Sequence, residues 1–288
     1  MTEDVVKASG QATDDFRCGY VALVGRPNVG KSTLMNRILG QKLSIVTAKP
    51  QTTRQRVAGI KTTGQGQIIY IDTPGIHLAA HRALNRYMNR IARASFHDVD
   101  LILFLVEAGR WTKQDEHVAR ALESVDVPVM LVVNKIDLVP DKTLLLKFLE
   151  DEVKRDRFAD VFLIAAKSGD GVQDLEDMVL KSLPFSRPFY DEDQWTDRSE
   201  RFLAAELVRE QLMTRLHQEL PYALTVEIEE FKREGGVLRI GAIIWVEREG
   251  QKHIVIGKGG SVLKQVGSRA RQALQELFEE KVFLRSWV

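Results

Sequence analysis

Hydrophobic positions in the first part of the chain follow two alternating patterns. Short, almost continuous apolar runs are separated by stretches in which apolar residues recur at helical spacing. The runs are Tyr20–Val24, Gln67–Ile71, Leu101–Val106, Val127–Val133 and Val161–Ala165, and the amphipathic stretches include Lys31–Leu39, Leu84–Ala94, Asp115–Ser124 and Leu144–Arg155. Strands that alternate with helices are typical of a mostly parallel sheet covered on both faces. We therefore predict a doubly wound α/β domain over residues 16–184.

The alternation ends at a polar segment, and a different order of elements follows. The stretch Pro184–Glu200 has two prolines, many charges and no apolar period, which predicts a linker over residues 185–200. The patterns beyond it predict a helix at Arg201–Leu220, strands at Tyr222–Lys232 and Val237–Arg248, a short apolar run at His253–Ile256, a long helix at Ser261–Glu280 and a last strand at Lys281–Val288. The order α-β-β-α-α-β predicts a smaller α+β domain over residues 201–288.

Composition narrows the setting without identifying a function. A length of 288 residues suits about two domains, and a net charge of +1 means that any basic surface is local. The single cysteine, Cys18, cannot form an internal disulfide. No segment approaches the roughly 18 apolar residues of a membrane-spanning helix. Residues 1–15 resemble neither a secretory signal nor a transit peptide, so we expect a disordered tail on a cytosolic protein.

A phosphate-binding motif lies between the first apolar run and the first amphipathic stretch. The sequence from Gly25 to Ser32 fits G-x-x-x-x-G-K-[ST] in full, in the strand–loop–helix context that the motif requires. The glycines let backbone N–H groups turn toward phosphate, and the helix N-terminus adds the positive end of a dipole. Lys31 places a cation near the β- and γ-phosphates, and the Ser32 hydroxyl is a magnesium ligand. The residues expected to bind the phosphates are Gly25, Arg26, Pro27, Asn28, Val29, Gly30, Lys31, Ser32 and Thr33.

A second motif follows the apolar run Gln67–Ile71. It consists of Asp72, Thr73, Pro74 and Gly75. A carboxylate at the end of a buried strand beside a phosphate loop can hold Mg²⁺ through water. The Gly75 N–H can approach a γ-phosphate because no Cβ stands in the way. Asp-x-x-Gly is a weak signal alone, but its position after a phosphate loop makes it an expected part of the nucleotide site.

Two further strand ends predict recognition of the base. In a purine site, a carboxylate that accepts from the guanine N1–H and 2-amino groups rejects adenine, because an unpaired buried polar group costs about 1–3 kcal/mol. Asp137 is the candidate carboxylate, Asn134 is expected to tie the loops together, and the Lys135 stem is expected to cover the base. At the next strand end, the backbone N–H of Ala166 is expected to reach the guanine O6. The expected base-binding residues are Asn134, Lys135, Asp137, Ala165, Ala166 and Lys167.

Together these motifs resemble the guanine-nucleotide-binding domain of translation-factor-class small GTPases. The resemblance implies binding of GTP and GDP with Mg²⁺, the metal being held by Ser32, Thr53 and Asp72. The segment Pro50–Arg54 is the predicted switch loop, in which a threonine hydroxyl reaches Mg²⁺ only when the γ-phosphate is present; a polar surface loop is the alternative. Thr53 is favoured over Thr52, because in related GTPases the metal-facing threonine directly precedes an arginine. The fifth motif usually begins with serine, whereas this chain has Ala165, which places the side-chain support of that loop in question.

The resemblance also bears on catalysis. Ras-like proteins carry a glutamine after the Asp-x-x-Gly turn that orients the attacking water, and the isoleucine at position 76 cannot do so. In potassium-stimulated relatives, an asparagine that matches Asn28 binds a monovalent cation, which makes K⁺ a candidate cofactor. The expected catalytic residues are Asn28, Lys31, Thr53 and Gly75.

The second domain carries a glycine loop in a basic setting. Gly257–Gly260 is a G-x-x-G loop before a long helix, and the stretch from Arg248 to Arg271 contains six cations and one anion. Such a loop lets a nucleic-acid backbone approach closely, and a local basic patch is a feature of nucleic-acid binding. A glycine turn beside a solvated basic helix face is the alternative. The expected RNA-binding residues are Ile256, Gly257, Lys258, Gly259, Gly260, Lys264, Arg269 and Arg271.

The order of elements around this loop resembles a prokaryotic-type (type II) KH domain, which clamps about four single-stranded nucleotides. A phosphate-loop GTPase joined to a KH domain resembles the Era family of bacterial GTPases, over roughly Gly19 to Val288. This resemblance implies binding of single-stranded rRNA near the 3′ end of the small-subunit rRNA, a role in small ribosomal subunit assembly, and RNA affinity controlled by GTP. It also implies a bacterial cytoplasmic protein with peripheral inner-membrane association, and no DNA partner is expected.

Two rival functions remain open on the sequence. One is an RNA chaperone that uses nucleotide only to stabilise its fold. The other is a GTPase of tRNA modification or membrane signalling whose C-terminal domain binds protein. Trp245, Trp287 and Phe231 lie on strand-like runs, and we expect them in the core rather than as platforms for stacked bases.

Overall fold

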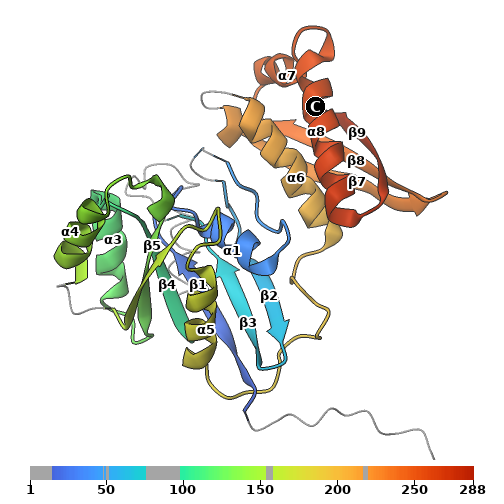
Figure 1. Cartoon of the computed structure of the whole chain (residues 1–288). Coiled ribbons are helices and arrows are strands. Elements are labelled where there is room, and N and C mark those ends of the chain that lie inside the picture. The colour runs from blue at the N-terminus through green and yellow to red at the C-terminus, as the bar shows by residue number, and fades with distance from the viewer. Residues whose placement is uncertain (1–14, 48, 50–51, 76–97, 154–157, 217–219) are drawn as a thin grey trace, which may run out of the picture.

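The computed structural model of the protein describes residues 15–47, 49, 52–75, 98–153, 158–216 and 220–288 (Figure 1). In the first domain these residues form a six-stranded sheet in the order β2-β3-β1-β4-β5-β6. The strands are β1 (Arg17–Val24), β2 (Val57–Thr63), β3 (Gly66–Asp72), β4 (Leu101–Glu107), β5 (Val129–Asn134) and β6 (Asp160–Ile164). All neighbouring pairs are parallel except β2 with β3. The predicted mostly parallel sheet is confirmed.

Helices cover both faces of this sheet. Among the described residues they are α1 (Lys31–Leu39), α3 (Lys113–Leu122), α4 (Lys142–Val153) and α5 (Val172–Ser182), with a short 3₁₀ turn at Ile136–Leu138. Apolar residues of α1 and α5 pack on one face, and those of α3 and α4 pack on the other. The expected helix Leu84–Ala94 lies outside the described residues, as do residues 1–14 of the expected tail. Two packed layers of side chains therefore hold the strand ends in fixed positions.

The linker crosses the edge of the sheet in close contact with it. The Ile60 N–H donates to the Trp195 carbonyl at 2.9 Å, and the Thr196 hydroxyl donates to the Ala58 carbonyl at 2.8 Å. The buried Gln67 side chain accepts from the Tyr190 N–H at 3.0 Å. The bonds to Ile60 and Ala58 satisfy backbone groups of the edge strand β2 that would otherwise face water, and the bond to Gln67 ties the linker to β3.

The second domain is a three-stranded sheet with helices on one face. Its elements are α6 (Glu200–Arg215), a 3₁₀ turn at Leu220–Tyr222, β7 (Leu224–Glu234), β8 (Val237–Val246), α7 (Glu249–Ile256), a 3₁₀ turn at Lys258–Gly260, α8 (Ser261–Phe278) and β9 (Lys281–Trp287). Strand β8 pairs antiparallel with β7 and parallel with β9. Residues of α6, α7 and α8 share a core with the strands. The predicted α-β-β-α-α-β order and the KH fold are confirmed, with α7 beginning before the apolar run that signalled it.

One expectation about the aromatic residues is wrong. Trp245 was expected in the core, but it is 55% exposed, because its neighbour Ile244 takes the side of β8 that faces the helices. Successive side chains on a strand point to opposite faces, so Trp245 faces away from the core. Phe231 does pack inward, in an edge-on contact with Phe278 at 5.8 Å between ring centroids. The ring of Trp287 lies over Gly241 and is partly buried.

Within the part of the chain that the structure describes, every helix is too short or too polar to cross a lipid bilayer.

Candidate functional site

The loop between β1 and α1 opens onto a cleft of about 390 Å³. The cleft brings together four segments that lie far apart in the sequence: the predicted phosphate loop, the predicted switch loop with residues 45–47 before it, the turn after β3, and Lys135 beyond β5. Its lining residues are Pro27, Asn28, Gly30, Lys31, Ser32, Thr33, Ile45, Val46, Thr47, Thr52, Thr53, Gly75 and Lys135. The predicted phosphate and metal groups therefore share one cavity at the carboxyl end of the strands.

The two motif glycines of the phosphate loop are needed for packing as well as for backbone shape. Gly30 has φ of 108°, and a Cβ there would lie 2.2 Å from Asn134 Nδ2. Gly25 has φ of 153°, and its Cβ would lie 2.5 Å from the Leu105 carbonyl oxygen. Both distances are far below contact, so another residue would have to displace the Asn134 side chain at position 30 or the backbone of β4 at position 25. Arg26, Pro27, Asn28 and Val29 form the loop between them.

Lys31 is buried at the base of this loop. Its Nζ donates to the Gly25 and Arg26 carbonyl oxygens, each at 3.0 Å. Burial lowers the pKa of Lys31 to about 8, although the nearby Asp72 opposes the shift. The lysine is therefore held by neutral carbonyls, without a full counter-charge, at the place where the motif predicts phosphate.

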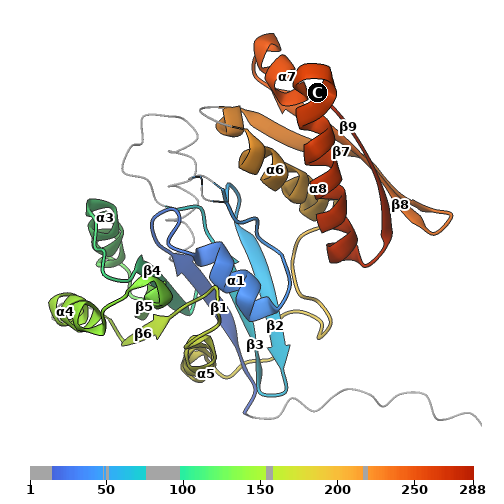
Figure 2. The ribbon, with the colours of Figure 1, turned by 45° about the horizontal axis from the view of Figure 1, so that its top comes forward.

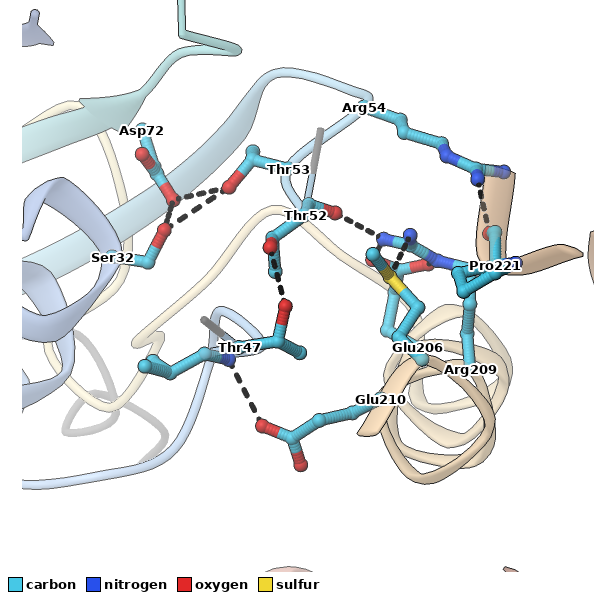
Figure 3. Close-up of polar contacts among 12 residues, drawn as sticks. Ser32, Thr47, Thr52, Thr53, Arg54, Asp72, Glu206, Arg209, Glu210 and Pro221 are labelled. Atoms are coloured by element: carbon cyan, nitrogen blue, oxygen red, sulfur yellow. Dashed lines mark hydrogen bonds and ion pairs between the residues drawn. The ribbon is translucent and has the colours of Figure 1, made fainter. Parts of the chain in front are cut away.

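Three oxygen-bearing side chains meet at the end of the cleft (Figure 3). Ser32 Oγ donates to Asp72 Oδ2 at 2.7 Å, Thr53 Oγ1 donates to the same oxygen at 3.2 Å, and the two hydroxyls lie 3.0 Å apart. Asp72 is fully buried and burial raises its pKa, while its Oδ1 atom has no hydrogen-bond partner. Hard oxygen donors around an unsatisfied buried carboxylate fit Mg²⁺, which takes one or two carboxylates together with phosphates and water.

The turn after β3 lies against the phosphate loop. A Cβ on Gly75 would be 2.8 Å from the Pro27 backbone nitrogen, so the turn can approach the loop only with glycine there. The Thr73 hydroxyl donates to the Leu23 carbonyl at 2.7 Å and anchors the turn on β1, with Pro74 following it. The isoleucine at position 76 lies outside the described residues. The Gly75 position thus depends on contact with Pro27 as well as on space for a ligand.

Asn134 connects three loops. Its Nδ2 donates to the Val29 carbonyl at 2.7 Å, and its Oδ1 accepts from the N–H groups of Lys135 at 2.8 Å and Ala166 at 2.9 Å. The Ala166 N–H, expected to reach guanine O6, is therefore engaged by Asn134 in this structure. A bound base would have to share that N–H or displace the asparagine.

The base-reading residues lie just beyond β5. Asp137 is exposed within the 3₁₀ turn Ile136–Leu138, so its carboxylate is open to a ligand. Lys135 has a left-handed backbone with φ of 67°. The Ala165 N–H donates to the Asp170 carbonyl and closes the turn containing Ala166 and Lys167. Within the same turn the Ser168 hydroxyl donates to Asp170 Oδ2 at 2.7 Å.

Sequence reasoning missed an ion-pair network beneath the phosphate loop. The buried Arg26 side chain bonds Glu107 Oε2 at 2.6 Å and Asp115 Oδ2 at 3.1 Å, and Lys135 Nζ lies 3.4 Å from the same Glu107 oxygen. Burial alone would raise the pKa of Glu107, but the two cations hold it below its ordinary value. Asp115 has a second task, since it forms a capping box with Thr112 at the start of α3. The Thr-x-x-Asp spacing could have marked the cap but not the partner.

Arg37 of α1 was also missed. Its guanidinium donates to the carbonyl oxygens of Ala166, at 3.4 Å, and of Lys167. Helix α1 thereby supports the loop after β6, from a residue far away in the sequence. No local motif signals this contact.

The G-x-x-G loop joins α7 to α8. A Cβ on Gly257, which has φ of 74°, would lie 2.5 Å from Val262 Cγ2, so this glycine is required by packing. Gly259 and Gly260 also have positive φ, but a Cβ on either meets nothing within 4 Å. Lys258, between Gly257 and Gly259, is exposed, and Ile256 is partly buried. The outer part of the loop is therefore open to a ligand backbone.

The expected RNA-binding cations of α8 do not all share one face. Lys264, Arg269 and Arg271 are exposed. At about 100° per residue, Lys264 and Arg271 lie near one line along the helix, while Arg269 lies roughly 140° around from Lys264. Lys264 and Arg271 thus form the consistent basic stripe that runs from the glycine loop.

The nucleotide site of the first domain and the glycine loop lie on opposite sides of the helix α6. In both views, α6 faces the loops of the first domain, and α7 with the glycine loop lies on the side away from it (Figures 1 and 2). Among the described residues, the second domain lies between the two sites.

Comparisons with families of known proteins match each part of the chain. A family model described as 50S ribosome-binding GTPase matches residues 20–135, and a KH domain model matches residues 219–287. GTPase Era of Stenotrophomonas maltophilia (strain K279a) is 54% identical over 94% of this chain and 91% of its own length. GTPase Era of Pseudomonas aeruginosa (strain LESB58) is also 54% identical, over 94% of this chain and 89% of its own.

Solved structures agree with these relatives. A crystal structure of Era in complex with MgGDPNP and nucleotides 1506–1542 of 16S ribosomal RNA matches with a TM-score of 0.90 and 40% identity, over 95% of this chain and 93% of that one. A single-residue variant of Aquifex aeolicus Era bound to GDP.AlF4⁻ matches with a TM-score of 0.89 and 39% identity, over 94% and 93%. The likeness covers both domains and their connection.

Proposed function

The chain belongs to the Era family of GTPases, and on that premise we propose that it hydrolyses GTP and binds single-stranded rRNA near the 3′ end of small-subunit rRNA during small ribosomal subunit assembly. The GTPase domain would span residues 16–184 and the KH domain residues 201–288, with the linker 185–200 between them. In this proposal the nucleotide state of the first domain controls the RNA affinity of the second.

The observation that carries the GTPase proposal is the meeting of Ser32, Thr53 and Asp72 around one buried carboxylate oxygen. These residues would hold Mg²⁺, which when bound offsets the negative charge that develops on the phosphates. Lys31 and the backbone N–H groups of Gly25–Thr33 would grip the phosphates, and Gly75 would detect the γ-phosphate. Asp137 would select guanine, with Asn134 and the Ala165–Lys167 turn supporting its loop.

The RNA proposal is supported by the open side of the glycine loop. Gly259 and Gly260 leave space for a sugar–phosphate backbone, and the exposed Lys258 supplies positive charge beside it. Lys264 and Arg271 continue that charge along α8. Ile254 of α7, which is 58% exposed, offers an apolar surface for bases near the loop.

The central experiment measures multiple-turnover GTP hydrolysis by the full chain with Mg²⁺, with and without a single-stranded oligonucleotide from the 3′ end of 16S rRNA. We expect turnover, and binding of the oligonucleotide that is lost in the double variant Lys258→Asp, Gly259→Asp. No measurable affinity for GTP or GDP would overturn the GTPase proposal. Unchanged RNA binding by the double variant would overturn the KH assignment and favour a protein-binding role for the second domain.

We also propose a monovalent-cation requirement at Asn28, whose backbone has φ of 64° in the phosphate loop. This conformation turns the loop sharply beside the predicted phosphates. Hydrolysis rates in K⁺ and in Na⁺ at equal ionic strength test the idea, and K⁺ should be faster. Equal rates would rule it out.

Finally, we propose that the protein acts in the bacterial cytoplasm with peripheral contact to the inner membrane, as the family resemblance implies. Co-flotation of the full chain with anionic and neutral vesicles tests this contact. Absence of co-flotation with either kind would remove the membrane part of the proposal and leave the GTPase part intact.

A further inference from the structure

The described residues of the segment 42–54, which are 42–47, 49 and 52–54 and include the predicted magnesium ligand Thr53, contact α6 and the turn that follows it. Figure 3 shows part of this contact: loop residues of the first domain reach Arg209 and Glu210 of α6 and Pro221 beyond the helix. The Val46 N–H donates to Glu210 Oε1 at 2.9 Å, and Lys42 Nζ pairs with Glu210 Oε2 at 2.5 Å. Lys49 Nζ donates to the carbonyl oxygens of Met213 and Leu216. The first half of the loop is thus fixed to α6.

Both chain neighbours of Thr53 are held by the second domain. The Thr52 carbonyl accepts from Arg209 Nη2 at 2.6 Å. On the other side, the Arg54 guanidinium donates to the carbonyl oxygens of Pro221 at 2.9 Å and Leu224 at 2.8 Å. Because the residues before and after Thr53 are both hydrogen-bonded to the second domain, the backbone of Thr53 has little freedom to turn its side chain away from Asp72.

Arg209 is built to hold its target firmly. It is 3% exposed, and its guanidinium is locked by two bonds to Glu206, at 2.6 Å and 2.5 Å. A charge-assisted bond from a preorganised, buried arginine is shorter and stronger than one between neutral groups. Glu206 sits one helical turn before Arg209, so the pair is fixed to the helix and moves with it.

Within the loop, hydrogen bonds of the Thr52 hydroxyl connect its first half, Thr47 and Lys49, to its second half. The Thr47 and Thr52 hydroxyls lie 2.8 Å apart, and Thr52 Oγ1 also donates to the Lys49 carbonyl at 2.7 Å. From Thr52 the chain passes directly to Thr53, whose hydroxyl reaches Asp72 and Ser32. A continuous set of contacts therefore runs from α6 to the predicted metal site.

We propose that Arg209 is a positioning residue for the GTP-bound state: by holding the Thr52 carbonyl, it keeps Thr53 aimed at the metal, so that closure of the loop over magnesium and GTP and docking of α6 favour each other. This inference rests on the proposed function, because it requires Thr53 to contact the metal only when the γ-phosphate is present. Arg209 itself is not among the residues that line the cleft. Because coupling between sites is reciprocal, the contact that helps GTP close the loop also lets GTP hold the second domain in place.

The proposed role of Arg209 predicts a loss of affinity for GTP but not for GDP. GDP lacks the γ-phosphate and does not need Thr53, so loss of Arg209 should weaken binding of a non-hydrolysable GTP analogue and spare GDP. We expect the ratio of the GTP-analogue affinity to the GDP affinity, in Mg²⁺, to fall about fivefold or more in Arg209→Ala, the range of ordinary allosteric coupling. A residue that merely braced the fold would lower both affinities together, or neither, along with the melting temperature.

The test uses the full chain and four single variants. Arg209→Ala and Arg54→Ala remove the grip from either side of Thr53, and both should lower the affinity ratio. Thr53→Ala removes the hydroxyl itself and sets the largest fall that is possible by this route. Arg215→Ala removes an exposed arginine from the same helix, outside these contacts, and should change the ratio by less than about twofold. Should Arg209→Ala fail to fold, Arg54→Ala, which leaves α6 intact, carries the same prediction.

A double variant separates the inference from the proposal beneath it. If Arg209 acts through Thr53, Arg209→Ala should lower the ratio in the normal chain and leave it unchanged in the Thr53→Ala chain. An unchanged ratio in Arg209→Ala and Arg54→Ala, with a lowered ratio in Thr53→Ala, would overturn the positioning role and leave the GTPase assignment standing. An unchanged ratio in Thr53→Ala would overturn the metal assignment of Thr53, and the inference with it.

Discussion

Asn134 offers a test of how the nucleotide site is held together before any ligand binds. Its side chain is 2% exposed and makes three hydrogen bonds to the backbone of three loops, at 2.7, 2.8 and 2.9 Å. Substitution by alanine leaves the Val29 carbonyl and the Ala166 N–H without these partners, and both groups belong to buried residues. The change therefore affects the framework of the site and not only contacts to a base.

The expected magnitude follows from the two buried groups. Each unsatisfied buried donor or acceptor costs about 1–3 kcal/mol. Water entering the space left by the amide would satisfy part of the loss, so we expect Asn134→Ala to lower the free energy of unfolding by about 2–4 kcal/mol. For a domain of this size, about 2–4 °C per kcal/mol corresponds to a fall of roughly 4–16 °C in melting temperature.

The assay is thermal unfolding of nucleotide-free protein, following the transition that GDP raises, because that transition reports the first domain. Asp137→Ala is the matched control. It removes an exposed side chain from the same motif, so it should change stability by less than about 0.5 kcal/mol while abolishing guanine selectivity. A change below about 1 kcal/mol in Asn134→Ala would refute the claim that this amide holds the loops.

The remaining predictions concern charge and shape at the two sites. Asp137→Asn should move preference from guanine to xanthine nucleotides by about tenfold or more, and unaltered preference in competition binding would contradict the base assignment. Burial lowers the pKa of Lys31 to about 8 from its ordinary 10.5, so the free protein should gain stability as pH rises between these values. Phosphate favours the charged lysine, so GTP binding near pH 8 should take up a proton. Calorimetry in buffers of different ionisation enthalpy measures this uptake, and finding none would count against the prediction. Asp72→Asn should stabilise nucleotide-free protein by roughly 1 kcal/mol and weaken Mg²⁺-dependent GTP binding, because burial raises the pKa of this carboxyl, whereas a lower melting temperature would argue against it. Gly257→Ala, with a Cβ 2.5 Å from Val262, should destabilise the KH domain by about 1–3 kcal/mol beyond the cost of its positive φ. Gly260→Ala, which meets only open space, should cost about 1–2 kcal/mol from its positive φ alone. Equal losses of unfolding free energy in the two variants would refute the packing argument.

The buried strands of the first domain could be predicted from the sequence because each is a short apolar run with turn residues after it. Strand β2 was not among the predicted strands. Only its first half is apolar, Gly59 interrupts the run, and it pairs antiparallel at the edge of the sheet. Its backbone is completed by the linker, through contacts such as Ile60 with Trp195, which no local pattern encodes. An edge strand that depends on a distant segment lacks the signal that a central strand carries.

The same distinction between local and distant contacts applies to the site. The phosphate loop and the Asp-x-x-Gly turn are local motifs, and the chemistry of each requires its residue types at its spacing. Arg26 with Glu107 and Asp115 is different, because these partners lie 81 and 89 residues apart in the chain. Whether these side chains meet in space depends on the order of strands in the sheet, which the spacing of residues along the sequence does not give.

Strand alternation explains why Trp245 was placed on the wrong side. The strand β8 has apolar residues at neighbouring positions, Ile243, Ile244 and Trp245, so its sequence has no clean period of two near this end. Only the packing of α6 and α8 decides that Ile244 faces the core. An aromatic residue at the end of such a run cannot be assigned to a face from the run itself.

The proposed coupling between the two domains depends on which charges are buried in the first domain and on which loop α6 contacts. Lys31 and Asp72 are both buried in the free protein, and burial opposes the charged form of each. Phosphate and magnesium would favour those charged forms, so ligand binding relieves an unfavourable arrangement within the first domain. The hydrogen bonds from α6 described above reach the segment 42–54 rather than the phosphate loop or the Asn134–Asp137 motif. The second domain is therefore placed to respond to closure of the loop around Thr53, which depends on the γ-phosphate, and not to the identity of the base.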